Sequence, residues 1–294
     1  NRLSVGVQSF QDRHLSLLGR IHSTEEALRS VEMARKAGFK RVNIDLMHGL
    51  PQQTPDDAAN DLKQALALAP EHISWYQLTI EPNTGFYSRP PTLPEEDTLA
   101  DIQEQGLALL SAAGFQQYEI SAYAKGGQKS KHNLNYWKFG DYLGIGAGAH
   151  SKISSPMTLN TRTSDSPGPK ESNVNPWSIK RRWKTRHPRH YLDPNRSFNA
   201  GEQQLDTAAL CLEFMMNALR LIDGVPTALF VQRTGLPLNL LEPALRRQQS
   251  RGLMVEFTDT EPKLQATAMG LRFLNTLLES FSYESVQSLQ HSGI

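Results

Sequence analysis

The chain has 294 residues, of which 38% are hydrophobic, so it is long enough to bury a full core in one large domain and a smaller one. Its 31 Lys and Arg residues balance 30 Asp and Glu residues, so its overall charge does not draw it to nucleic acid or to an acidic membrane. The single cysteine, Cys211, excludes an intrachain disulfide framework and a cysteine-ligated cluster, and it favours a reducing cytoplasm.

The termini and the apolar runs carry no targeting signal. No run reaches the length of about 20 residues that spans a bilayer, and the N-terminus has no signal-peptide pattern. Because the chain begins at Asn1, directly in strand-like sequence, we expect that residues have been lost upstream.

Strand and helix patterns alternate through the first 120 residues. Residues 2–8 alternate apolar and polar side chains, and a helix follows between the Ser23–Glu26 capping box and Gly38. Residues 41–46, 72–80 and 115–120 are further expected strands, separated by a helix that Thr54 caps and by a helix at 95–113. Units of this kind predict a parallel sheet and part of a (β/α) barrel.

Polar side chains stand where the expected strands end. In the strand at 41–46, Asn43 and Asp45 face away from the apolar Val42, Ile44 and Leu46. Ligands of such barrels gather at the C-terminal ends of the strands. The residues at these ends are Gln8, Asp45 with His48, Thr79 with Glu81, and the region after Ile120.

The composition changes after the last of these strands. Residues 154–196 are rich in Ser, Pro, Asn and basic residues, with a basic cluster at 180–190, and we expect a loop or an ordered excursion there. Beyond it we expect an amphipathic helix that Gly224 stops, two shorter helices, a strand near 253–257 and a last helix at 271–278. This order favours a small helical, winged-helix-like domain.

Six segments resemble the HemW and anaerobic coproporphyrinogen oxidase family of radical S-adenosylmethionine (SAM) proteins. They follow one another in the order and spacing of that family, and they are residues 2–10, 18–22, 43–51, 75–84, 132–137 and 144–150. The resemblance implies an α/β chain with a partial parallel (β/α) radical SAM barrel at 1–152. A basic connecting segment at 153–199 and a HemN-type C-terminal helical domain at 200–282 would follow.

The resemblance also implies a SAM site. Gln8 and Asp45 would lie at the ribose or its surroundings, Arg20 at the carboxylate, and the backbone around Thr79 beside the adenosine. The cysteine loop and the Gly-rich segment of the family are missing here. A [4Fe–4S] cluster is therefore expected only in a full-length parent, and this chain alone cannot cleave SAM to a radical.

The segment His132-Asn-Leu-Asn-Tyr-Trp137 resembles the HemW branch, whose members bind haem and pass it on. We therefore expect a haem chaperone, with haem as cargo and an unidentified acceptor protein. His132 is the first candidate for a haem contact, with His150 and His48 behind it, although a His-Asn pair also serves to hydrogen-bond a loop. The basic and aromatic residues at 183–191 also resemble this branch and suit haem propionates.

Four other interpretations remain, and some of them are weakly supported. An oxygen-independent coproporphyrinogen III oxidase is the alternative within the family, which leaves enzyme activity undecided. A nucleic-acid-binding protein is the alternative from another class, but the candidate recognition helix offers only Arg246 and Arg247, so we expect no nucleic acid partner. The basic cluster leaves a peripheral membrane contact open.

Gly144, Gly146 and Ala149 loosely match a dinucleotide fingerprint, but a closing turn of the barrel is favoured.

Overall fold

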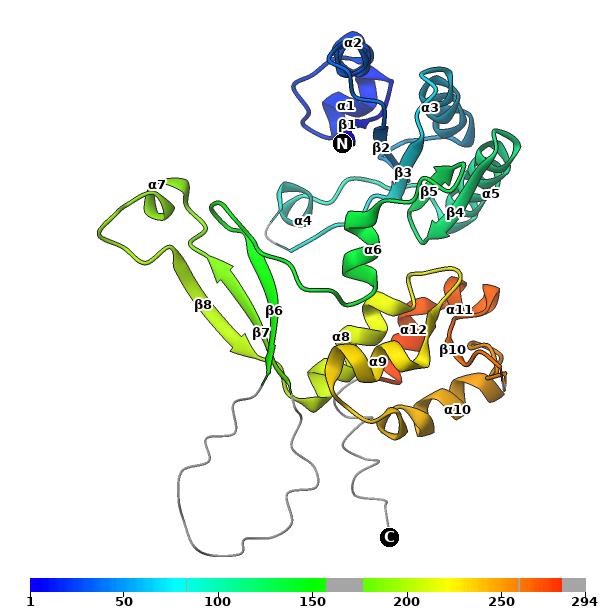
Figure 1. Cartoon of the computed structure of the whole chain (residues 1–294). Coiled ribbons are helices and arrows are strands. Elements are labelled where there is room, and N and C mark those ends of the chain that lie inside the picture. The colour runs from blue at the N-terminus through cyan, green and yellow to red at the C-terminus, as the bar shows by residue number, and fades with distance from the viewer. Residues whose placement is uncertain (83, 157–176, 259, 282–294) are drawn as a thin grey trace, which may run out of the picture. The chain divides into compact units, whose positions relative to one another are not determined.

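The computed structural model describes residues 1–82, 84–156, 177–258 and 260–281. The chain forms two compact units, Asn1–Ser130 and Lys131–Ile294 (Figure 1). In the described part, no helix combines the length and the apolar character that a membrane span requires. The domain boundaries at 152 and 199 stay predictions, and residues 157–176 and 282 of those domains lie outside the described residues.

A five-stranded sheet forms the centre of the first unit. Its order is β1 (Leu3–Gln8), β2 (Val42–His48), β3 (His72–Gln77), β5 (Ala122–Lys125) and β4 (Phe115–Glu119). The first three strands are parallel, as predicted, and β4 runs in the same direction.

The sheet is mixed, because β5, a strand that was not predicted, lies between β3 and β4 and is antiparallel to both. A short turn after β4 reverses the chain, and within that turn the Ser121 carbonyl accepts a 2.8 Å hydrogen bond from Trp75 N. This bond and the pairing of His72 with Ala124 join the hairpin to β3.

Three long helices of the first unit lie where the sequence predicts them, and two of them begin at a capping signal. Ser23 and Thr54 each accept a hydrogen bond from the backbone three residues on and complete a capping box. The long helices are α2 (Thr24–Lys36), α3 (Pro55–Ala67) and α5 (Glu96–Ala112), and the short helices α1 (Asp12–Leu17) and α4 (Gly85–Ser88) were not predicted.

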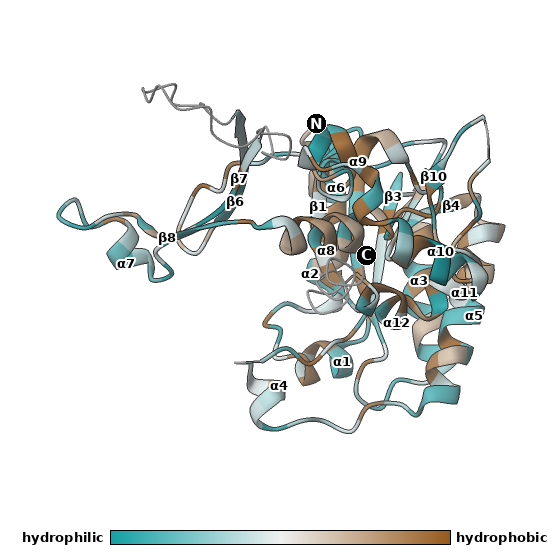
Figure 2. Ribbon diagram, turned by 90° about the horizontal axis from the view of Figure 1, so that it is seen from below, coloured by the Kyte–Doolittle hydropathy of each residue, from teal (hydrophilic) through white to brown (hydrophobic). Residues whose placement is uncertain are grey.

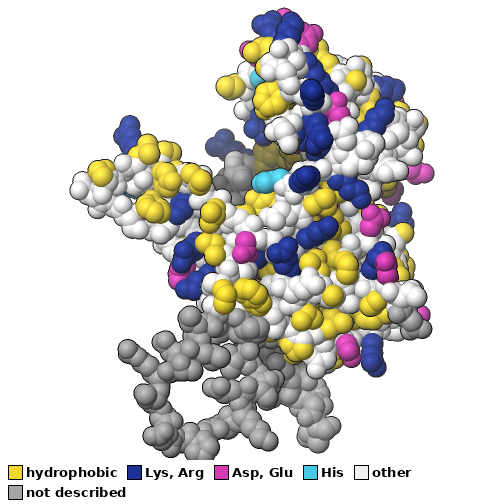
Figure 3. Space-filling model, viewed as in Figure 1, with side chains coloured by type: hydrophobic (Ala, Val, Ile, Leu, Met, Phe, Trp, Pro, Cys, Tyr) yellow, Lys and Arg dark blue, Asp and Glu magenta, His cyan; other side chains and the backbone are white. Residues whose placement is uncertain are grey.

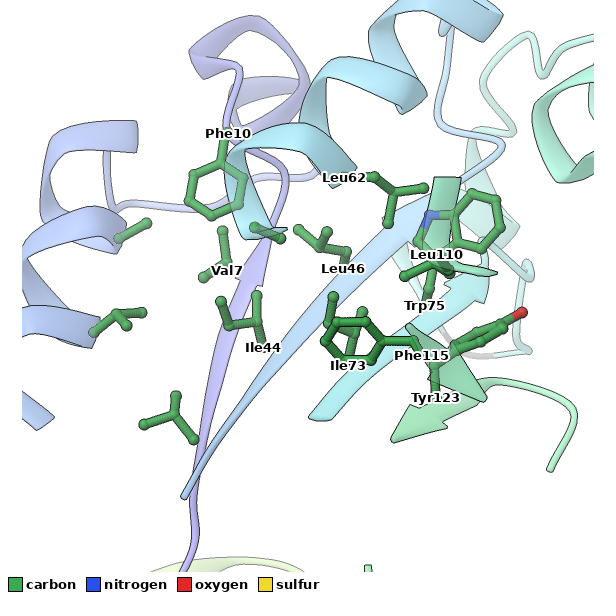
Figure 4. Close-up of a cluster of buried hydrophobic side chains, with 14 of the residues drawn as sticks. Val7, Phe10, Ile44, Leu46, Leu62, Ile73, Trp75, Leu110, Phe115 and Tyr123 are labelled. Atoms are coloured by element: carbon green, nitrogen blue, oxygen red, sulfur yellow. The ribbon is translucent and has the colours of Figure 1, made fainter. Parts of the chain in front are cut away.

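The apolar side chains of the sheet pack against these helices in one cluster (Figure 4). Ile44 and Leu46 from β2 and Ile73 from β3 are fully buried, and Leu62 of α3 and Leu110 of α5 pack in the same cluster. The opposite face of β2 carries Asn43 and Asp45, as the alternation predicts, so this face is left for polar chemistry.

Gly106 provides a direct test of this packing. A methyl group at this position in α5 would lie 1.9 Å from the ring of Trp75, whereas one at Gly85 meets open space. Although alanine favours a helix over glycine, Gly106→Ala is expected to destabilise the chain by about 1–3 kcal/mol through overpacking. Gly85→Ala, the matched control, is expected to be neutral or slightly stabilising. Urea unfolding followed by circular dichroism measures both, and a stabilised Gly106→Ala variant would contradict this packing.

The second unit begins with α6 (Lys131–Trp137) and contains a three-stranded antiparallel sheet. The sheet consists of β6 (His150–Pro156), β7 (Trp177–Lys184) and β8 (Asn199–Gln204), with β7 in the centre. A four-residue helix, α7 (Pro188–Tyr191), lies in the connection between β7 and β8. The described part of residues 154–196 is therefore an ordered segment with strands and a short helix. Of the two expected possibilities, a loop or an ordered excursion from the core, this is the second.

The remainder of the second unit is mainly helical and surrounds α8, whose ribbon is largely apolar in Figure 2. Phe214 of α8 is fully buried, with its ring centroid 5.6 Å from that of Phe139 and 5.2 Å from that of Phe230. The elements are α8 (Thr207–Ala218), β9 (Val225–Pro226), α9 (Thr227–Thr234), the 3₁₀ helix η1 (Leu238–Leu240), α10 (Glu242–Ser250), β10 (Lys263–Leu264), α11 (Ala268–Arg272) and α12 (Leu274–Glu279).

Two predictions for this region are wrong. The strand expected at 253–257 is a single bridge between Met254 and Ala266, because the Val255 carbonyl accepts from the Gln249 side chain at 3.1 Å. The helix expected at 271–278 is broken at Phe273, whose φ of −110° and ψ of 38° are not helical.

Candidate functional site

A network of hydrogen bonds covers the polar face of the parallel strands. Asn43 Nδ2 lies 2.7 Å from both Ser4 Oγ and Asp45 Oδ1, and Ser4 Oγ donates to Asp45 Oδ2 at 2.8 Å. Each carboxylate oxygen of Asp45 therefore already accepts one hydrogen bond, one from Asn43 of the same strand and the other from Ser4 of β1. A carboxylate oxygen has room for a second donor, so Asp45 is held in place and can still accept from a ligand.

His72 extends this network into the interior. Its Nδ1 lies 2.6 Å from Asn43 Oδ1 and its Nε2 lies 2.9 Å from the Tyr118 hydroxyl. The amide oxygen only accepts, so Nδ1 donates to it, and in a neutral imidazole Nε2 then accepts from the tyrosine hydroxyl. Burial, with a smaller effect from Arg2, lowers the pKa of His72 to about 3, in agreement with a neutral imidazole.

At the C-terminal edge of the sheet, Tyr76 interacts with three of the four predicted SAM residues, by a hydrogen bond or through their charge. The Tyr76 hydroxyl donates to Gln8 Oε1 at 2.8 Å. Burial and the charge of Asp45 raise the pKa of Tyr76, whereas the charge of Arg20 lowers it, so both charges act at this hydroxyl. Gln8 has a φ of +71°, a left-handed conformation that is strained for any residue but glycine and is typical of functional positions.

Thr79 is separate from this group. It lies two residues beyond β3, is exposed, and its hydroxyl donates to Glu81 Oε1 at 3.3 Å. The roles of Gln8, Arg20, Asp45 and Thr79 toward SAM stay predictions. The donors and acceptors around Tyr76 fit a ligand that carries both a carboxylate and hydroxyls, since Arg20 is exposed and Asp45 accepts hydrogen bonds.

The loop that follows Gln8 is held by a buried carboxylate that sequence analysis missed. Asp61 of α3 is 1% exposed and accepts hydrogen bonds from Ser9 Oγ and Phe10 N, both at 2.8 Å. Burial raises the pKa of Asp61 to about 6 even though these hydrogen bonds oppose the shift. In the sequence, Asp61 stands beside the apolar Leu62 within a helix, a position that gives no sign of a buried role.

The raised pKa of Asp61 predicts a pH dependence of stability. Because the folded pKa lies above the ordinary value of 3.8, the folded chain binds this proton more tightly than the unfolded chain does. The resulting stabilisation is complete below pH 4 and is lost as the pH rises to about 6, and two pKa units correspond to about 3 kcal/mol. Asp61→Asn should remove this loss, so urea unfolding should show the advantage of the variant growing from pH 4 to 6. An advantage that is constant over this range would contradict the buried, ionising carboxylate.

Two of the three candidate haem histidines differ sharply in exposure. His48 of β2 is 6% exposed, lies 4.2 Å from the ring centroid of Trp75, and has its pKa lowered to about 4 by burial. A large macrocycle cannot reach such a position without unpacking the core. His150, at the start of β6, is exposed.

His132 is exposed near the start of α6 and is the first of three rings that contact one another edge-on. Its ring meets that of Tyr136 edge-on, with centroids 4.7 Å apart, and Tyr136 meets Tyr142 at 4.5 Å. Trp137 follows at the end of the same helix and packs under the guanidinium of Arg220, 4.3 Å from the ring centroid. An accessible imidazole therefore adjoins a group of aromatic rings, which suits an iron porphyrin.

Much of the basic cluster at 180–190 is neutralised by carboxylates. Lys180 and Arg182 lie on one face of β7 and both pair with Glu202, at 2.7 and 2.8 Å. Arg181 points to the other face and pairs with Glu213 of α8. The strand part of the cluster is therefore largely structural.

The Gly-rich segment at 144–150 lies in the second compact unit, and its expected role as a closing turn of the barrel stays a prediction. It precedes β6, and Gly148 N donates to Thr185 O at 3.0 Å beside β7. The glycines are needed because Gly146 and Gly148 have positive φ angles.

The residues of this chain do not fit an iron–sulfur cluster. Cys211 is the only cysteine, it is fully buried in α8, and burial raises the pKa of its thiol to about 12. Among the described residues, no group of three His, Cys, Asp or Glu side chains is placed to hold a metal ion.

Comparison with known proteins gives matches over both units. The radical SAM superfamily matches residues 1–65, and the HemN C-terminal domain matches residues 205–273. The heme chaperone HemW of Escherichia coli (strain K12) is 46% identical over 289 residues, which cover 97% of this chain and 69% of that protein. The heme chaperone HemW of Haemophilus influenzae is 46% identical over 283 residues, which cover 96% of this chain and 68% of that protein.

Among solved structures, the chain resembles coproporphyrinogen III oxidase (HemN) from Escherichia coli, a radical SAM enzyme. The TM-score is 0.67 at 21% identity, over 97% of this chain and 64% of that chain. At this identity the likeness concerns the fold, and it supports an α/β radical SAM fold with a C-terminal HemN-type domain.

Proposed function

The chain belongs to the HemW family of radical SAM proteins, and we propose that it is a haem chaperone that binds haem and passes it to an acceptor protein. The observation that carries this proposal is the 46% identity to two proteins named heme chaperone HemW, across at least 96% of the chain. No described residue specifically favours the oxidase alternative.

We place the haem at α6, with His132 as the proposed axial ligand. The exposed imidazole of His132 is accessible to the iron, and Tyr136 and Tyr142 offer ring surface beside it. A site at the surface suits a carrier, because haem has to leave again. His150 is the second candidate, since it is also exposed, and the burial of His48 argues against a role for that residue.

Membership of the radical SAM family implies SAM and a [4Fe–4S] cluster. We propose that Gln8, Arg20, Asp45 and the backbone at Thr79 contact SAM at the edge of the sheet. Arg20 would pair with the SAM carboxylate, and Asp45, which Ser4 and Asn43 hold, would accept from a hydroxyl. A cluster reduces and cleaves SAM in proteins that hold one, but no residue set of this chain fits it, so no radical step is part of the proposal.

The amino-acid composition supports a cellular compartment for the proposed haem transfer. With one cysteine, the chain forms no disulfide of its own, and we propose that it works in the reducing cytoplasm. The acceptor is a protein that takes up haem. The proposal includes no nucleic acid partner, and a peripheral membrane contact through the basic residues near α7 stays a prediction.

A transfer assay tests the proposed function. The chain is mixed with ferric haem, freed of excess haem by gel filtration, and then mixed with apomyoglobin. We expect a Soret band that co-elutes with the chain and then changes to that of myoglobin. A chain that retains no haem, or one that never releases it, would contradict a chaperone.

A further inference from the structure

A small cavity in the second unit lies beside the aromatic residues of α6. Its volume is about 140 Å³. Its walls include Tyr136, Trp137, Tyr142, Lys152, Arg181 and Asn217, which come from α6, the loop that follows it, β6, β7 and α8. The cavity is far larger than the roughly 10–15 Å³ that one water needs.

Two cations in the wall of this cavity are held in place. The side chain of Lys152 is 2% exposed, and its Nζ donates to Asp141 Oδ1 at 2.8 Å. Arg181 donates from Nη1 to the Tyr142 hydroxyl at 2.6 Å and from Nε to Glu213 at 3.0 Å. Their positions therefore do not depend on a ligand, as a preorganised binding site requires.

One wall residue of the cavity, Trp137, carries a donor that lacks its acceptor. The indole Nε1 of Trp137 is buried from solvent, and no hydrogen-bond partner is found for it among the described residues. An indole N–H can only donate, and a buried donor without an acceptor costs about 1–3 kcal/mol. A buried N–H beside an ammonium and a guanidinium calls for an acceptor that is negatively charged.

We propose that this cavity binds a carboxylate, and that in the haem-loaded chain the carboxylate is one of the haem propionates. This assignment rests on the proposed haem-carrying function. Trp137 Nε1–H would donate to one carboxylate oxygen, and Lys152 and Arg181, which also pair with Asp141 and Glu213, would lie beside the carboxylate. Hydrogen bonds to a charged acceptor are the stronger kind.

The position of the cavity relative to His132 supports this choice of carboxylate. Tyr136 lines the cavity and also contacts the His132 ring at a centroid distance of 4.7 Å. Tyr142, another wall residue, lies 4.5 Å from Tyr136. One side chain thus separates the proposed iron ligand from the proposed carboxylate site, so a single haem has both within reach.

A comparison of the affinities for haem and for haem dimethyl ester, in which both propionates are esterified, tests this proposal. Wild-type chain is expected to bind haem at least about tenfold more tightly than the ester in Soret titrations, since one charge-assisted hydrogen bond contributes about 1.5–3 kcal/mol. Trp137→Phe keeps the ring and removes the N–H, so it should weaken haem binding about tenfold and leave ester binding unchanged.

A matched pair of arginines on β7 provides the second comparison. Arg181→Gln should weaken haem binding, whereas Arg182→Gln should not, because Arg182 points to the opposite face and pairs with Glu202. Thermal melting of each variant confirms that it is folded. Equal binding of haem and ester by a chain that does bind haem would overturn the propionate assignment and leave the haem-carrying function standing.

Binding of sodium propionate alone tests the cavity without haem. In a ¹H–¹⁵N spectrum, the Trp137 indole resonance, assigned by its absence in Trp137→Phe, should shift saturably with propionate. If the wild type binds no haem, the proposed function fails, and this shift still decides whether the cavity takes a carboxylate. A shift with inorganic phosphate and not with propionate would overturn the choice of ligand.

Discussion

Trp75→Ala is expected to lower the free energy of unfolding of the first unit by about 3–5 kcal/mol, the usual cost of removing a large buried aromatic side chain. Trp75 is 2% exposed and lies in the apolar cluster of Figure 4. The centroid of its ring lies 4.2 Å from that of His48 and 6.4 Å from that of Tyr123, and both pairs of rings are tilted. No neighbour can fill the space that the indole leaves without moving a strand.

Tyr87→Ala is the control, because Tyr87 is 58% exposed and its loss should change stability by no more than about 0.5 kcal/mol. Urea unfolding followed by circular dichroism measures both variants. Combining Trp75→Ala with Gly106→Ala should relieve the clash of the added methyl group. A loss below 1 kcal/mol for Trp75→Ala would contradict the packing.

His132→Ala is expected to weaken haem binding by about tenfold or more, a change of at least 1.4 kcal/mol, because the iron loses its protein ligand. The measurement is a Soret titration, in which the variant should also lose the band position of the wild-type complex. Since His132 is exposed, its removal should leave the melting temperature unchanged.

His150→Ala and His190→Ala are the matched controls, because both histidines are exposed and lie outside α6. Neither substitution should change the affinity for haem. Loss of binding in His150→Ala with full binding in His132→Ala would move the ligand to β6 and contradict the assignment.

The parts of the fold that sequence analysis predicted correctly depend on local signals. The helices that begin after Ser23 and Thr54 were located because a capping box involves residues three positions apart. The hairpin formed by β4 and β5 was missed because its second strand pairs with residues about 50 positions earlier. No local pattern in residues 122–125 shows which neighbour they will meet.

The same limit applies to the candidate site. Gln8 and Asp45 were predicted from their places on the expected strands and from the family resemblance, but Tyr76, whose hydroxyl donates to Gln8, is 68 residues from it. The alternation of β3, which places Ser74 and Tyr76 on one face, was the available signal. The pairs of Arg181 with Glu213 and of Lys180 with Glu202 also lie beyond sequence reasoning, and they convert a basic cluster into a largely neutral strand.

Figure 3 shows Lys and Arg side chains scattered over the visible face of the second unit. Hydrophobic side chains gather on the arm of the chain that contains α7 and the connection between β7 and β8. The exposed residues of this arm include Leu192 and Phe198, which are 75% and 52% exposed. The positive charge is therefore distributed over this face. The cations of the α6 cavity differ from it because Lys152 is buried and because Lys152 and Arg181 have fixed partners.

The most direct test of the central claim, that this chain carries haem, is a visible-absorbance titration of the wild-type chain with ferric haem. We expect a Soret band that grows linearly and saturates at one equivalent of haem per chain. A spectrum that follows free haem throughout, with no saturation, would contradict the account.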